Sequence, residues 1–495
     1  MLFRELLASA GVLFSGGDHN IEIQGIAYDS RQVQPGFLFV AVKGLKSDGH
    51  VYVQQALEQG AAAVLLQRKV TVPPCTAWAL VPDTRHALAM LAARFFGNPS
   101  TYLKMIGVTG TNGKTTTTNL IDAVLTAAGQ KTGLIGTICN KIGEQIMPVK
   151  HTTPESADLQ QILADMVSAG VETCVMEVSS HALALNRVDG CEFDLAIFTN
   201  LTQDHLDFHR DMENYLQAKL KLFHSLTEPG LKKNAKYGVI NADDPAAGRF
   251  SLAAGGTVYT FGVKNTADVQ AVDIKVNNRG TSLTVIGKWG HCPLNLQLTG
   301  LFNVYNVLGA FTAAAALGVP VGIIKDALEQ IQGVPGRFER LDAGQDFTVI
   351  VDYAHTPDGL ENVLKTARQI AGGRLILVFG CGGDRDRSKR PIMGSIAAKY
   401  SDLQIVTSDN PRLEDPVQIL KDIEAGIPPA GKETYTIEQD RRRAIQLAVE
   451  MANAGDVVVI AGKGHEDYQI IGKNTYPFDD RQEALAALTD KVSGL

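Results

Sequence analysis

The stretch Gly107–Thr118, GVTGTNGKTTTT, is the part of the chain around which the rest must be arranged. It follows the apolar run Leu103–Val108 and leads into Asn119–Ala128, where apolar residues recur at helical spacing until Gly129 ends the pattern. We therefore predict a strand, a glycine-rich turn and a helix, in that order. Such a turn directs several backbone N–H groups and the positive end of a helix dipole at one point, which suits a chain of phosphates.

Lys114 and Thr115 supply the two side chains that a phosphate site of this kind needs. In a P-loop the lysine reaches the β- and γ-phosphates, and the hydroxyl holds a Mg²⁺ that bridges them. One position departs from the strict pattern, because Val108 stands where a P-loop has glycine and the first glycine is Gly107. The alternative is an ordinary glycine turn before a helix, and Gly-Lys-Thr in this context favours the phosphate site.

The composition is that of an ordinary globular protein, and its 495 residues are enough for about three domains. The 46 basic and 53 acidic residues give a net charge of −7, which disfavours nucleic acid as the main partner. The six cysteines include no C-x-x-C pair, so we expect neither a disulfide framework nor a cysteine zinc site, and a cytoplasmic location. The chain has no run of 18 apolar residues, so no membrane insertion is expected.

The order of apolar runs predicts an α/β protein with a small N-terminal α/β domain and a central parallel-sheet domain. Residues 1–99 alternate helical stretches with the short β-like runs Ile21–Ala27, Phe37–Val42, Ala62–Leu66 and Ala77–Val81. Residues 100–335 contain the near-continuous apolar runs Val171–Val178 and Asp194–Phe198, which are typical of a parallel sheet covered on both faces. Two further runs alternate like antiparallel strands, Val258–Gly262 and Ala271–Ile286.

Residues 336–495 predict a third, Rossmann-like domain in which four strands alternate with helical patterns. The predicted strands are Phe347–Val351, Leu375–Phe379, Leu403–Thr407 and Val457–Ala461. Each one ends in a polar cluster, and these clusters are Asp352–His355, Gly380–Arg385, Asp409–Arg412 and Gly462–Glu466. Because the carboxyl ends of parallel strands meet at one edge, we expect the clusters to form a binding rim, although strand-to-helix loops are commonly polar.

The same edge rule applies to the central domain, where Glu177 and the loop Thr199–His205 follow strands. The Glu177 carboxylate suits a Mg²⁺ position next to Thr115 and the phosphates. On a helix His205 and His209, four residues apart, would share one face. No glutamate follows the first histidine and no third soft ligand is evident, so a dedicated zinc site is not favoured.

Lys219 occupies an unusual position in the predicted helix Met212–Leu226. It lies within the apolar sector of that helix, whereas Lys221 points away from it. A buried lysine is costly unless it is paired or neutral. Either the stem packs while the amine reaches water, or the amine is chemically special, and the residues alone favour the first of these two arrangements.

Taken together, these segments resemble the Mur ligases, the ATP-dependent amide-forming family that builds the peptidoglycan stem peptide. The resemblance extends over essentially the whole chain. It rests on the motifs Thr109–Thr115, Glu177–His181, Asn200–His205, Gly300–Asn303, Gly336–Glu339 and Asp352–His355. Asp409–Arg412 with Gly462–Glu466 further resembles the member that adds the third amino acid of the stem.

The resemblance implies ATP as co-substrate, bound between the central and C-terminal domains, and Mg²⁺ as cofactor. The residues that it implies for ATP are Gly110, Thr111, Asn112, Gly113, Lys114, Thr115, Thr116, Asn303, Arg337, Asp352 and His355. Those implied for Mg²⁺ are Thr115, Glu177, His205 and a carbamylated Lys219; Lys114, Glu177, His205 and Lys219 are the implied catalytic residues. Carbamylation makes an anionic oxygen donor and needs the neutral amine that a desolvated site favours, so the resemblance reverses the preference stated above for Lys219.

The implied reaction joins meso-2,6-diaminopimelate to the D-Glu γ-carboxylate of UDP-MurNAc-L-Ala-D-Glu through an acyl phosphate. The residues implied for the UDP-MurNAc-dipeptide are Ser30, Leu45, Lys46, Ser47, His151, Thr152, Thr153, Ser179, Leu185 and Arg187, although His151 stands where Asn is common and Leu185 where Gln is expected. Those implied for diaminopimelate are Arg385, Asp409, Asn410, Pro411, Arg412, Gly462 and Glu466. A guanidinium can hold the carboxylate that distinguishes diaminopimelate from lysine, so Arg412 and Arg385 are expected to select the amino acid.

Several other functions are compatible with the central motif. Within the superfamily these are an L-lysine-adding ligase, which Arg412 disfavours, and folylpolyglutamate synthase, which has no need for the N-terminal unit or for Asp409–Arg412. From other classes, a P-loop NTPase switch or a UDP-sugar sensor is less compatible with the C-terminal rim and with Lys114, Thr115 and Glu177 together. We expect a monomer that acts on small molecules and closes its third domain over the P-loop.

Overall fold

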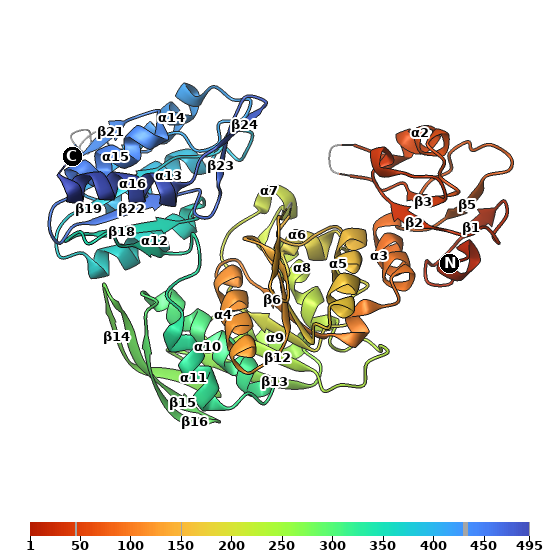
Figure 1. Cartoon of the computed structure of the whole chain (residues 1–495), viewed down its shortest axis with the longest axis horizontal. Coiled ribbons are helices and arrows are strands. Elements are labelled where there is room, and N and C mark those ends of the chain that lie inside the picture. Colours follow the sequence, from red (N-terminus) through yellow and green to blue (C-terminus); the bar gives the residue numbers. More distant parts are fainter. Residues whose placement is uncertain (45–46, 150, 429–433, 495) are drawn as a thin grey trace. The chain divides into compact units, whose positions relative to one another are not determined.

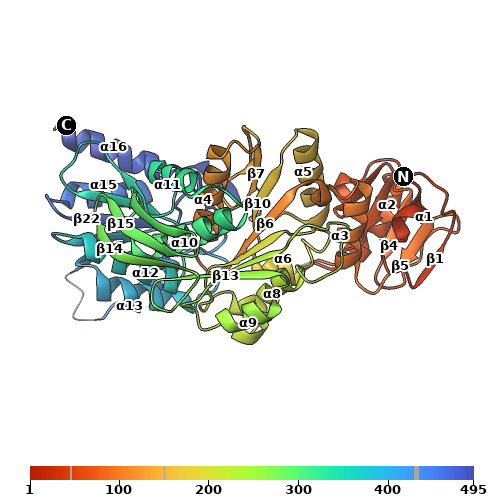
Figure 2. The same cartoon turned by 90° about the horizontal axis from the view of Figure 1, so that it is seen from below.

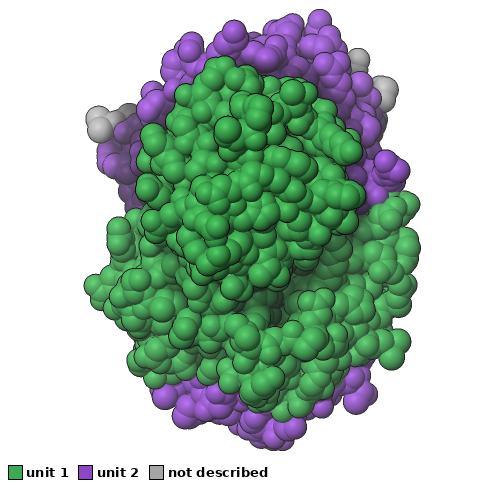
Figure 3. Space-filling model, turned by 90° about the vertical axis from the view of Figure 1, so that its right-hand side faces the viewer, with its two compact units in different colours: residues 1–110, 125–199, 211–260 green, residues 111–124, 200–210, 261–495 purple. Residues whose placement is uncertain are grey.

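A computed structural model describes residues 1–44, 47–149, 151–428 and 434–494 (Figure 1). Leu45 and Lys46, predicted to contact the nucleotide sugar, lie outside the described residues. The chain forms two compact units, of which unit 1 contains residues 1–110, 125–199 and 211–260, and unit 2 contains residues 111–124, 200–210 and those from 261 onward (Figure 3). The predicted division into three domains, 1–99, 100–335 and 336–495, stays a prediction.

The N-terminal part of unit 1 is a five-stranded sheet of order β1-β5-β4-β3-β2, parallel except for β1. Its strands and helices are β1 (Phe14–Gly16), β2 (Gly25–Ala27), β3 (Phe37–Val40), β4 (Ala63–Leu66), β5 (Ala77–Leu80), α1 (Phe3–Leu7), α2 (Val53–Glu58) and α3 (Thr84–Phe95). Because side chains alternate along a strand, Leu38 joins the core with α1 and α3, and Phe39 joins the core with α2. The sequence predicted β2 to β5 but missed β1, which is too short to show a period.

The rest of unit 1 is the parallel sheet predicted around the glycine-rich turn, with strand order β12-β11-β6-β10-β7 followed by antiparallel β8 and β9. Its elements are β6 (Lys104–Thr109), β7 (Thr132–Ile135), β8 (Asn140–Ile142), β9 (Gln145–Met147), β10 (Thr173–Glu177), β11 (Leu195–Phe198), β12 (Tyr237–Asn241), α5 (Ser156–Ser168), α6 (Ser180–Ala184), α8 (Met212–His224) and α9 (Ala247–Ala253). Glu177 pairs with Val108, and Phe198 pairs with Thr109. The ends of β10 and β11 therefore lie beside the end of β6.

Unit 2 begins with the first turns of α4 (Lys114–Ala127), the helix predicted after the glycine-rich turn. Its other elements before the C-terminal sheet are α7 (Leu206–His209), β14 (Val269–Asn277), β15 (Gly280–Gly287), β16 (Gly290–Leu296), α10 (Leu301–Ala316) and α11 (Val321–Gln330). The predicted antiparallel pairing is confirmed for β14 and β15, and β16, which was not predicted, pairs with β15 in the same antiparallel way. It is wrong for β13 (Thr257–Gly262), whose last residues pair with β14 in parallel, because apolar alternation does not reveal strand direction.

The C-terminal sheet of unit 2 has the strand order β17-β18-β22-β19-β20-β21 and is parallel except for β17. Its elements are β17 (Glu339–Leu341), β18 (Thr348–Asp352), β19 (Leu375–Phe379), β20 (Leu403–Val406), β21 (Tyr435–Ile437), β22 (Val457–Ala461), α12 (Pro357–Ile370), α13 (Lys389–Tyr400), α14 (Pro416–Glu424), α15 (Arg441–Met451), α16 (Asp480–Ser493) and the hairpin β23 (Tyr468–Ile471) and β24 (Asn474–Pro477). Helices α12 to α14 pack on one face, where Leu377 is buried, and α15 and α16 pack on the other, where Val378 is buried (Figure 2). The predicted doubly wound α/β fold is confirmed. None of the described helices has the length and apolar content needed to cross a bilayer.

The first residues of α15 and α16 form a fully buried ion pair, Arg441 with Asp480, in which Nε and Nη2 each donate to one carboxylate oxygen at 2.7 and 2.6 Å. Asp480→Ala leaves the guanidinium buried without its anion, and we expect a loss of about 3–5 kcal/mol in the free energy of unfolding, measured by urea denaturation. The control is Glu450→Ala, which removes the exposed partner of Arg443 and should leave the urea midpoint unchanged. Equal midpoints for the two variants would contradict this expectation.

Candidate functional site

The glycine-rich turn is held by side chains from two other segments of unit 2. The N–H groups of Thr111 and Asn112 donate to the carbonyl and the side chain of Asn200, at 2.8 and 2.9 Å. The Asp358 carboxylate accepts from the Asn112 amide at 2.7 Å and from the Thr202 hydroxyl at 2.8 Å. Asn200 and Thr202 belong to a quoted motif, but the role of Asp358 was missed, because an acid in the first turn of α12 is accounted for by the helix dipole alone.

Gly113 is the residue on which the geometry of the turn depends. Its φ is +85°, and a Cβ there would lie 2.3 Å from Asn306 Oδ1. Asn306 was not predicted as a site residue, whereas Asn303 was; Asn303 is buried and accepts from the Asn306 amide at 3.1 Å. Asn303 therefore supports the turn through Asn306. The Lys114 ammonium donates to Thr111 O at 2.8 Å.

Arg337 connects the first turn of α4 with the end of β18. Its Nη2 donates to Thr115 Oγ1 at 3.0 Å, and its guanidinium lies 4.6 Å from the centre of the Tyr353 ring. The buried Arg337 Nε has no hydrogen-bond partner among the described residues. Thr116, also predicted to contact ATP, is buried within α4. A lysine and an arginine thus accompany the N-terminus of α4, and this arrangement favours an anion.

Asp352 is the last residue of β18, His355 follows the strand, and burial shifts the pKa of both side chains. Desolvation raises the pKa of Asp352 to about 6, although the Arg337 charge and N–H donors from Phe338 and Ala354 act in the opposite direction. Desolvation lowers the pKa of His355 to about 4, and the charge of Lys389 adds to this effect. His355 is therefore a neutral imidazole at pH 7, with Nδ1 at 2.8 Å from the Tyr353 carbonyl.

The two arginines predicted to select the amino acid flank Gly382. A Cβ on Gly382 would lie 2.8 Å from Arg412 Nη1 and 3.7 Å from Arg385 Cγ. Arg412 is half-buried, has a left-handed φ of 53°, and donates to Gly383 O at 2.8 Å. Arg385 is exposed and donates only to Asp384 O at 3.2 Å among the described contacts. The structure therefore brings two arginine side chains, from the loops after β19 and β20, to the same glycine.

Two carboxylates complete this rim. Asp409 is 7% exposed, and its Oδ2 would lie 2.7 Å from a Cβ on Gly462, whose φ is +120°. Glu466 Oε2 accepts from Asn410 Nδ2 at 2.9 Å. The neighbouring Pro411 is buried. Because the strands end side by side, the predicted rim is a single cluster, and its arginines and carboxylates are suited to a ligand that carries both carboxylate and ammonium groups.

Unit 1 contains a second cluster, at the end of β10. The buried Glu177 carboxylate accepts from the N–H and the hydroxyl of Thr137 at 2.7 and 3.1 Å. The Thr137 hydroxyl lies 3.1 Å from that of Thr152, and the Thr153 hydroxyl donates to Glu177 O at 2.8 Å. The Ser179 hydroxyl is 3.4 Å from that of Thr153. The structure thus joins Glu177 to three of the residues predicted for the muramoyl dipeptide, Thr152, Thr153 and Ser179.

Arg187 extends the second cluster toward the N-terminal sheet. It donates to Thr153 O at 3.0 Å and pairs with Glu155 at 2.7 Å. Glu155 also pairs with Arg85 at 3.3 Å, and Arg85 donates to Lys43 O at 3.4 Å. No pattern in the sequence pointed to Glu155 or Arg85, because isolated charges are common on surfaces. Among the residues that the structure describes, no hydrogen bond joins this cluster to four other predicted residues, Ser30, Ser47, His151 and Leu185.

The amine of Lys219 does not reach water, so the arrangement that the residues alone favoured, with a packed stem and a solvated amine, is wrong. Lys219 is 1% exposed, and its Nζ donates to Gly110 O at 2.7 Å and lies 4.5 Å from the centre of the Tyr215 ring. This carbonyl belongs to the glycine-rich turn, and the sequence could not show that Lys219 contacts that turn. Lys221 is exposed, as predicted.

His205 and His209 do not share a helix face. His205 has a left-handed φ of 55° and precedes α7, which begins at Leu206. Its side chain is 41% exposed, with Nε2 at 3.2 Å from Asp204 Oδ2, whereas His209 is buried. In the described part of the chain, no group of three or more His, Cys, Asp or Glu side chains is arranged to hold a metal ion.

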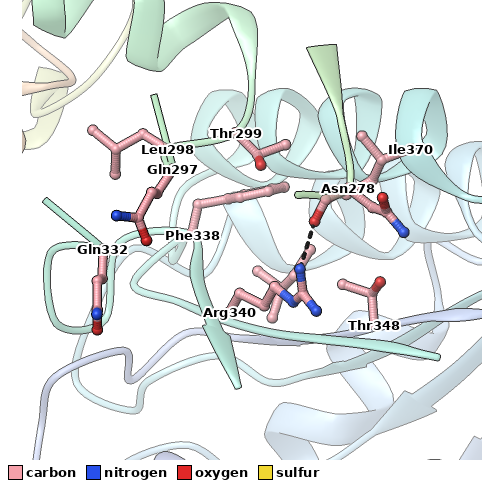
Figure 4. A pocket seen from close by; sticks show the side chains of 10 residues that line it. Asn278, Gln297, Leu298, Thr299, Gln332, Phe338, Arg340, Thr348 and Ile370 are labelled. Atoms are coloured by element: carbon pink, nitrogen blue, oxygen red, sulfur yellow. Dashed lines mark hydrogen bonds between the residues drawn. The ribbon is translucent and has the colours of Figure 1, made fainter. Parts of the chain in front are cut away.

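A shallow crevice in unit 2 lies near the segment after Arg337 (Figure 4). It contains about 340 Å³ of empty space, including open solvent, and Arg340 Nη1 donates to Asn278 O beside it at 2.9 Å. The lining residues are Asn278, Gln297, Leu298, Thr299, Gln332, Phe338, Arg340, Thr348, Ile350 and Ile370. None of them belongs to the predicted site, so the crevice is not the candidate site.

Comparison with known proteins gives matches along nearly the whole chain. Residues 22–96 match the catalytic domain of the Mur ligase family, residues 108–314 the Mur ligase middle domain, and residues 336–464 the Mur ligase glutamate ligase domain. Proteins named UDP-N-acetylmuramoyl-L-alanyl-D-glutamate–2,6-diaminopimelate ligase are similar to the chain. The one from Syntrophomonas wolfei subsp. wolfei is 50% identical and covers 99% of both chains; that from Geobacillus thermodenitrificans is 49% identical and covers 95% of this chain and 96% of its own. A solved structure with the same name is 34% identical, with a TM-score of 0.70 and 99% of each chain covered.

The neutral His355 makes stability depend on pH. Its folded pKa of about 4 lies below the ordinary 6.5, so the unfolded chain binds the proton first as the pH falls through this window, and stability is lost. Relative to His355→Gln, the wild type should lose about 3 kcal/mol between pH 6.5 and pH 4. Urea unfolding of both proteins across this range measures the difference, in which the opposite effect of Asp352 cancels. A difference that does not vary with pH would contradict the neutral imidazole.

Proposed function

The chain belongs to the Mur ligase family, and on that premise we propose that it joins meso-2,6-diaminopimelate to the D-Glu γ-carboxylate of UDP-MurNAc-L-Ala-D-Glu at the expense of ATP. The observation that carries the substrate assignment is the rim at the carboxyl ends of β19, β20 and β22. It combines Arg412 and Arg385 with the carboxylates of Asp409 and Glu466. Relatives that are about half identical over nearly the full length support the same substrate.

The proposed chemistry has two displacement steps. A γ-carboxylate oxygen of the D-glutamyl residue attacks the γ-phosphorus of ATP, and the bond to ADP breaks. The amine of diaminopimelate then attacks the acyl carbon, phosphate leaves, and the amine loses a proton. The first step is needed because a carboxylate is a poor electrophile, and phosphorylation supplies the leaving group.

The residues around the glycine-rich turn of unit 2 are proposed to bind ATP. The N–H groups at the start of α4 and the Lys114 ammonium would face the phosphates, and Arg337, 3.0 Å from the Thr115 hydroxyl, would add a second positive charge. Asn303 would act through Asn306, which fixes the turn. Asp352 and the neutral His355 would hold the segment that carries Arg337 and Tyr353.

Mg²⁺ is proposed as the cofactor, and it supplies positive charge to the phosphates. Thr115 and Glu177 offer the oxygen donors that Mg²⁺ prefers. An unmodified Lys219 does not fit a cation, because its ammonium is positive and donates to Gly110 O. A carbamate on Lys219 would fit, since it provides anionic oxygen, and its burial favours the neutral amine from which a carbamate forms. His205, with an exposed ring, is retained as a fourth proposed ligand.

The proposed partners are the three small-molecule substrates, and the proposed state is a monomer in the cytoplasm, where ATP is available. Thr152, Thr153, Ser179 and Arg187 are proposed to contact the muramoyl dipeptide, because they form one cluster with Glu177. The contacts proposed for Ser30 and the loop at Ser47 rest on the resemblance.

The function is tested by incubating the protein with ATP, Mg²⁺, UDP-MurNAc-L-Ala-D-Glu and one amino acid at a time. We expect phosphate release and a product of the summed mass with meso-diaminopimelate, and neither with L-lysine, since the carboxylate is what the arginines recognise. Product with L-lysine alone would indicate the lysine-adding ligase. Phosphate release independent of any amino acid would indicate an NTPase switch.

Arg412→Ala should raise the KM for diaminopimelate roughly 100-fold and leave the KM for ATP unchanged, because it removes a charge-assisted, fork-shaped contact to the substrate carboxylate. Steady-state kinetics with each substrate varied in turn measure both constants. Arg387→Ala is the matched control, since this arginine lies two residues beyond the Gly380–Arg385 cluster but is 66% exposed and pairs with Glu414. An unchanged KM for diaminopimelate in Arg412→Ala would remove Arg412 from the site.

A further inference from the structure

Lys463 belongs to the polar cluster Gly462–Glu466 and lies inside the amino-acid rim, but it was not predicted as a site residue. Its side chain is 0% exposed, and its Nζ lies 3.1 Å from Glu466 Oε2 and 3.3 Å from Asn410 Oδ1. The ring of Tyr468 lies beside the ammonium, with its centre at 5.3 Å. An ammonium remains charged in a buried position only when its partners offset the lost hydration, so the contacts with Glu466 and Asn410 are essential to its position.

The network around Lys463 fixes the side chain of Asn410. Asn410 Oδ1 accepts from Lys463 and, at 2.9 Å, from the N–H of Ile470. With its oxygen held by two donors, the amide must turn its Nδ2 toward Glu466 Oε2, which it reaches at 2.9 Å. Lys463 therefore orients two of the residues that were predicted to contact the substrate, Asn410 and Glu466.

The two oxygens of Glu466 are held unequally, Oε2 by two short contacts and Oε1 by one long contact. Oε2 receives both Asn410 and Lys463, whereas the one contact of Oε1 among the described residues is the Tyr353 hydroxyl at 3.5 Å. The side chain of Glu466 is 15% exposed. Oε1, whose one described contact is long, is thus the oxygen with capacity to accept a hydrogen bond from a ligand.

The charges of the rim agree with this arrangement. Asp409 and Glu466 contribute two negative charges, and Lys463 offsets one of them from the buried side. The remaining single negative charge matches one substrate ammonium, while Arg412 and Arg385 match a carboxylate.

We propose that Lys463 is a positioning residue for the amino-acid substrate: its ammonium fixes Glu466 and Asn410 so that Glu466 Oε1 accepts a hydrogen bond from the substrate ammonium. This inference rests on the proposed function and goes beyond it, because Lys463 touches the substrate only through its two partners. Its removal should therefore act on amino-acid binding and leave nucleotide binding intact.

The test is steady-state kinetics of Lys463→Met, which keeps the length of the side chain and removes the donors. We expect the KM for diaminopimelate to rise about 10- to 100-fold, with the KM for ATP and for UDP-MurNAc-L-Ala-D-Glu unchanged. Lys463→Gln, which retains one donor group, should raise the KM for diaminopimelate less than Lys463→Met does. It replaces Lys463→Met as the test if the Met variant lacks a cooperative thermal transition. Arg374→Met is the control and should leave all three KM values unchanged. Arg374 pairs with Asp456 just before β19 and β22 begin, at the end of the sheet opposite the rim.

A double-mutant cycle with Glu466→Gln separates positioning from general support of the fold. If Lys463 acts through Glu466, Lys463→Met should change the KM for diaminopimelate much less in the Glu466→Gln background than in the wild type. Additive effects, or a rise in all three KM values together, would overturn the proposal. A wild type that uses another amino acid would overturn the proposed function instead, and the KM for that amino acid would then test Lys463 separately.

Discussion

Parallel strands deliver their carboxyl ends to one edge of a sheet, and the proposed binding residues of this protein depend on that constraint. In unit 1 the register of β6 and β10 places Glu177 beside Val108, close in sequence to the glycine-rich turn. In unit 2 the neighbouring strands β18, β22, β19 and β20 gather loops that are up to 114 residues apart, from Asp352 to Glu466, into one rim. Burial of both sheet faces makes the register rigid, so the loops inherit fixed positions.

Charged groups at these edges are stabilised by networks. Lys219 and Lys463 are both buried, and each is held by oxygen acceptors that belong to the proposed sites. Where contacts do not fully compensate burial, the pKa shifts in the direction that favours the neutral form of the side chain, upward for Asp352 and downward for His355. A neutral His355 has one donor nitrogen and one acceptor nitrogen, and it adds no positive charge beside Lys389. The electrostatics of the rim are thus decided by depth of burial as much as by residue type.

Much of the fold could be predicted because apolar runs of strand length that are bounded by glycine are characteristic of buried parallel strands. β19 and β22 were predicted with their observed bounds, and the turn before α4 was predicted from Gly-Lys-Thr. The direction of β13 and the short strand β1 could not be predicted, since alternation carries no sign of strand direction and three residues show no period. His205 and His209 would share a face only if both were helical, and His205 is not, because it has a left-handed φ and precedes the helix.

The amino-acid sequence was sufficient to establish the α/β class, the phosphate-binding turn, the strands and the four polar clusters, because these features depend on local periodicity and on residue types adjacent in the chain. Which distant groups meet was settled by the tertiary structure alone. It placed Asp358 on Asn112, the ammonium of Lys219 on Gly110 O, and that of Lys463 on Glu466. The cause is that hydrogen bonds and burial depend on distances between segments, and strand order and register, which sequence periodicity does not encode, set those distances.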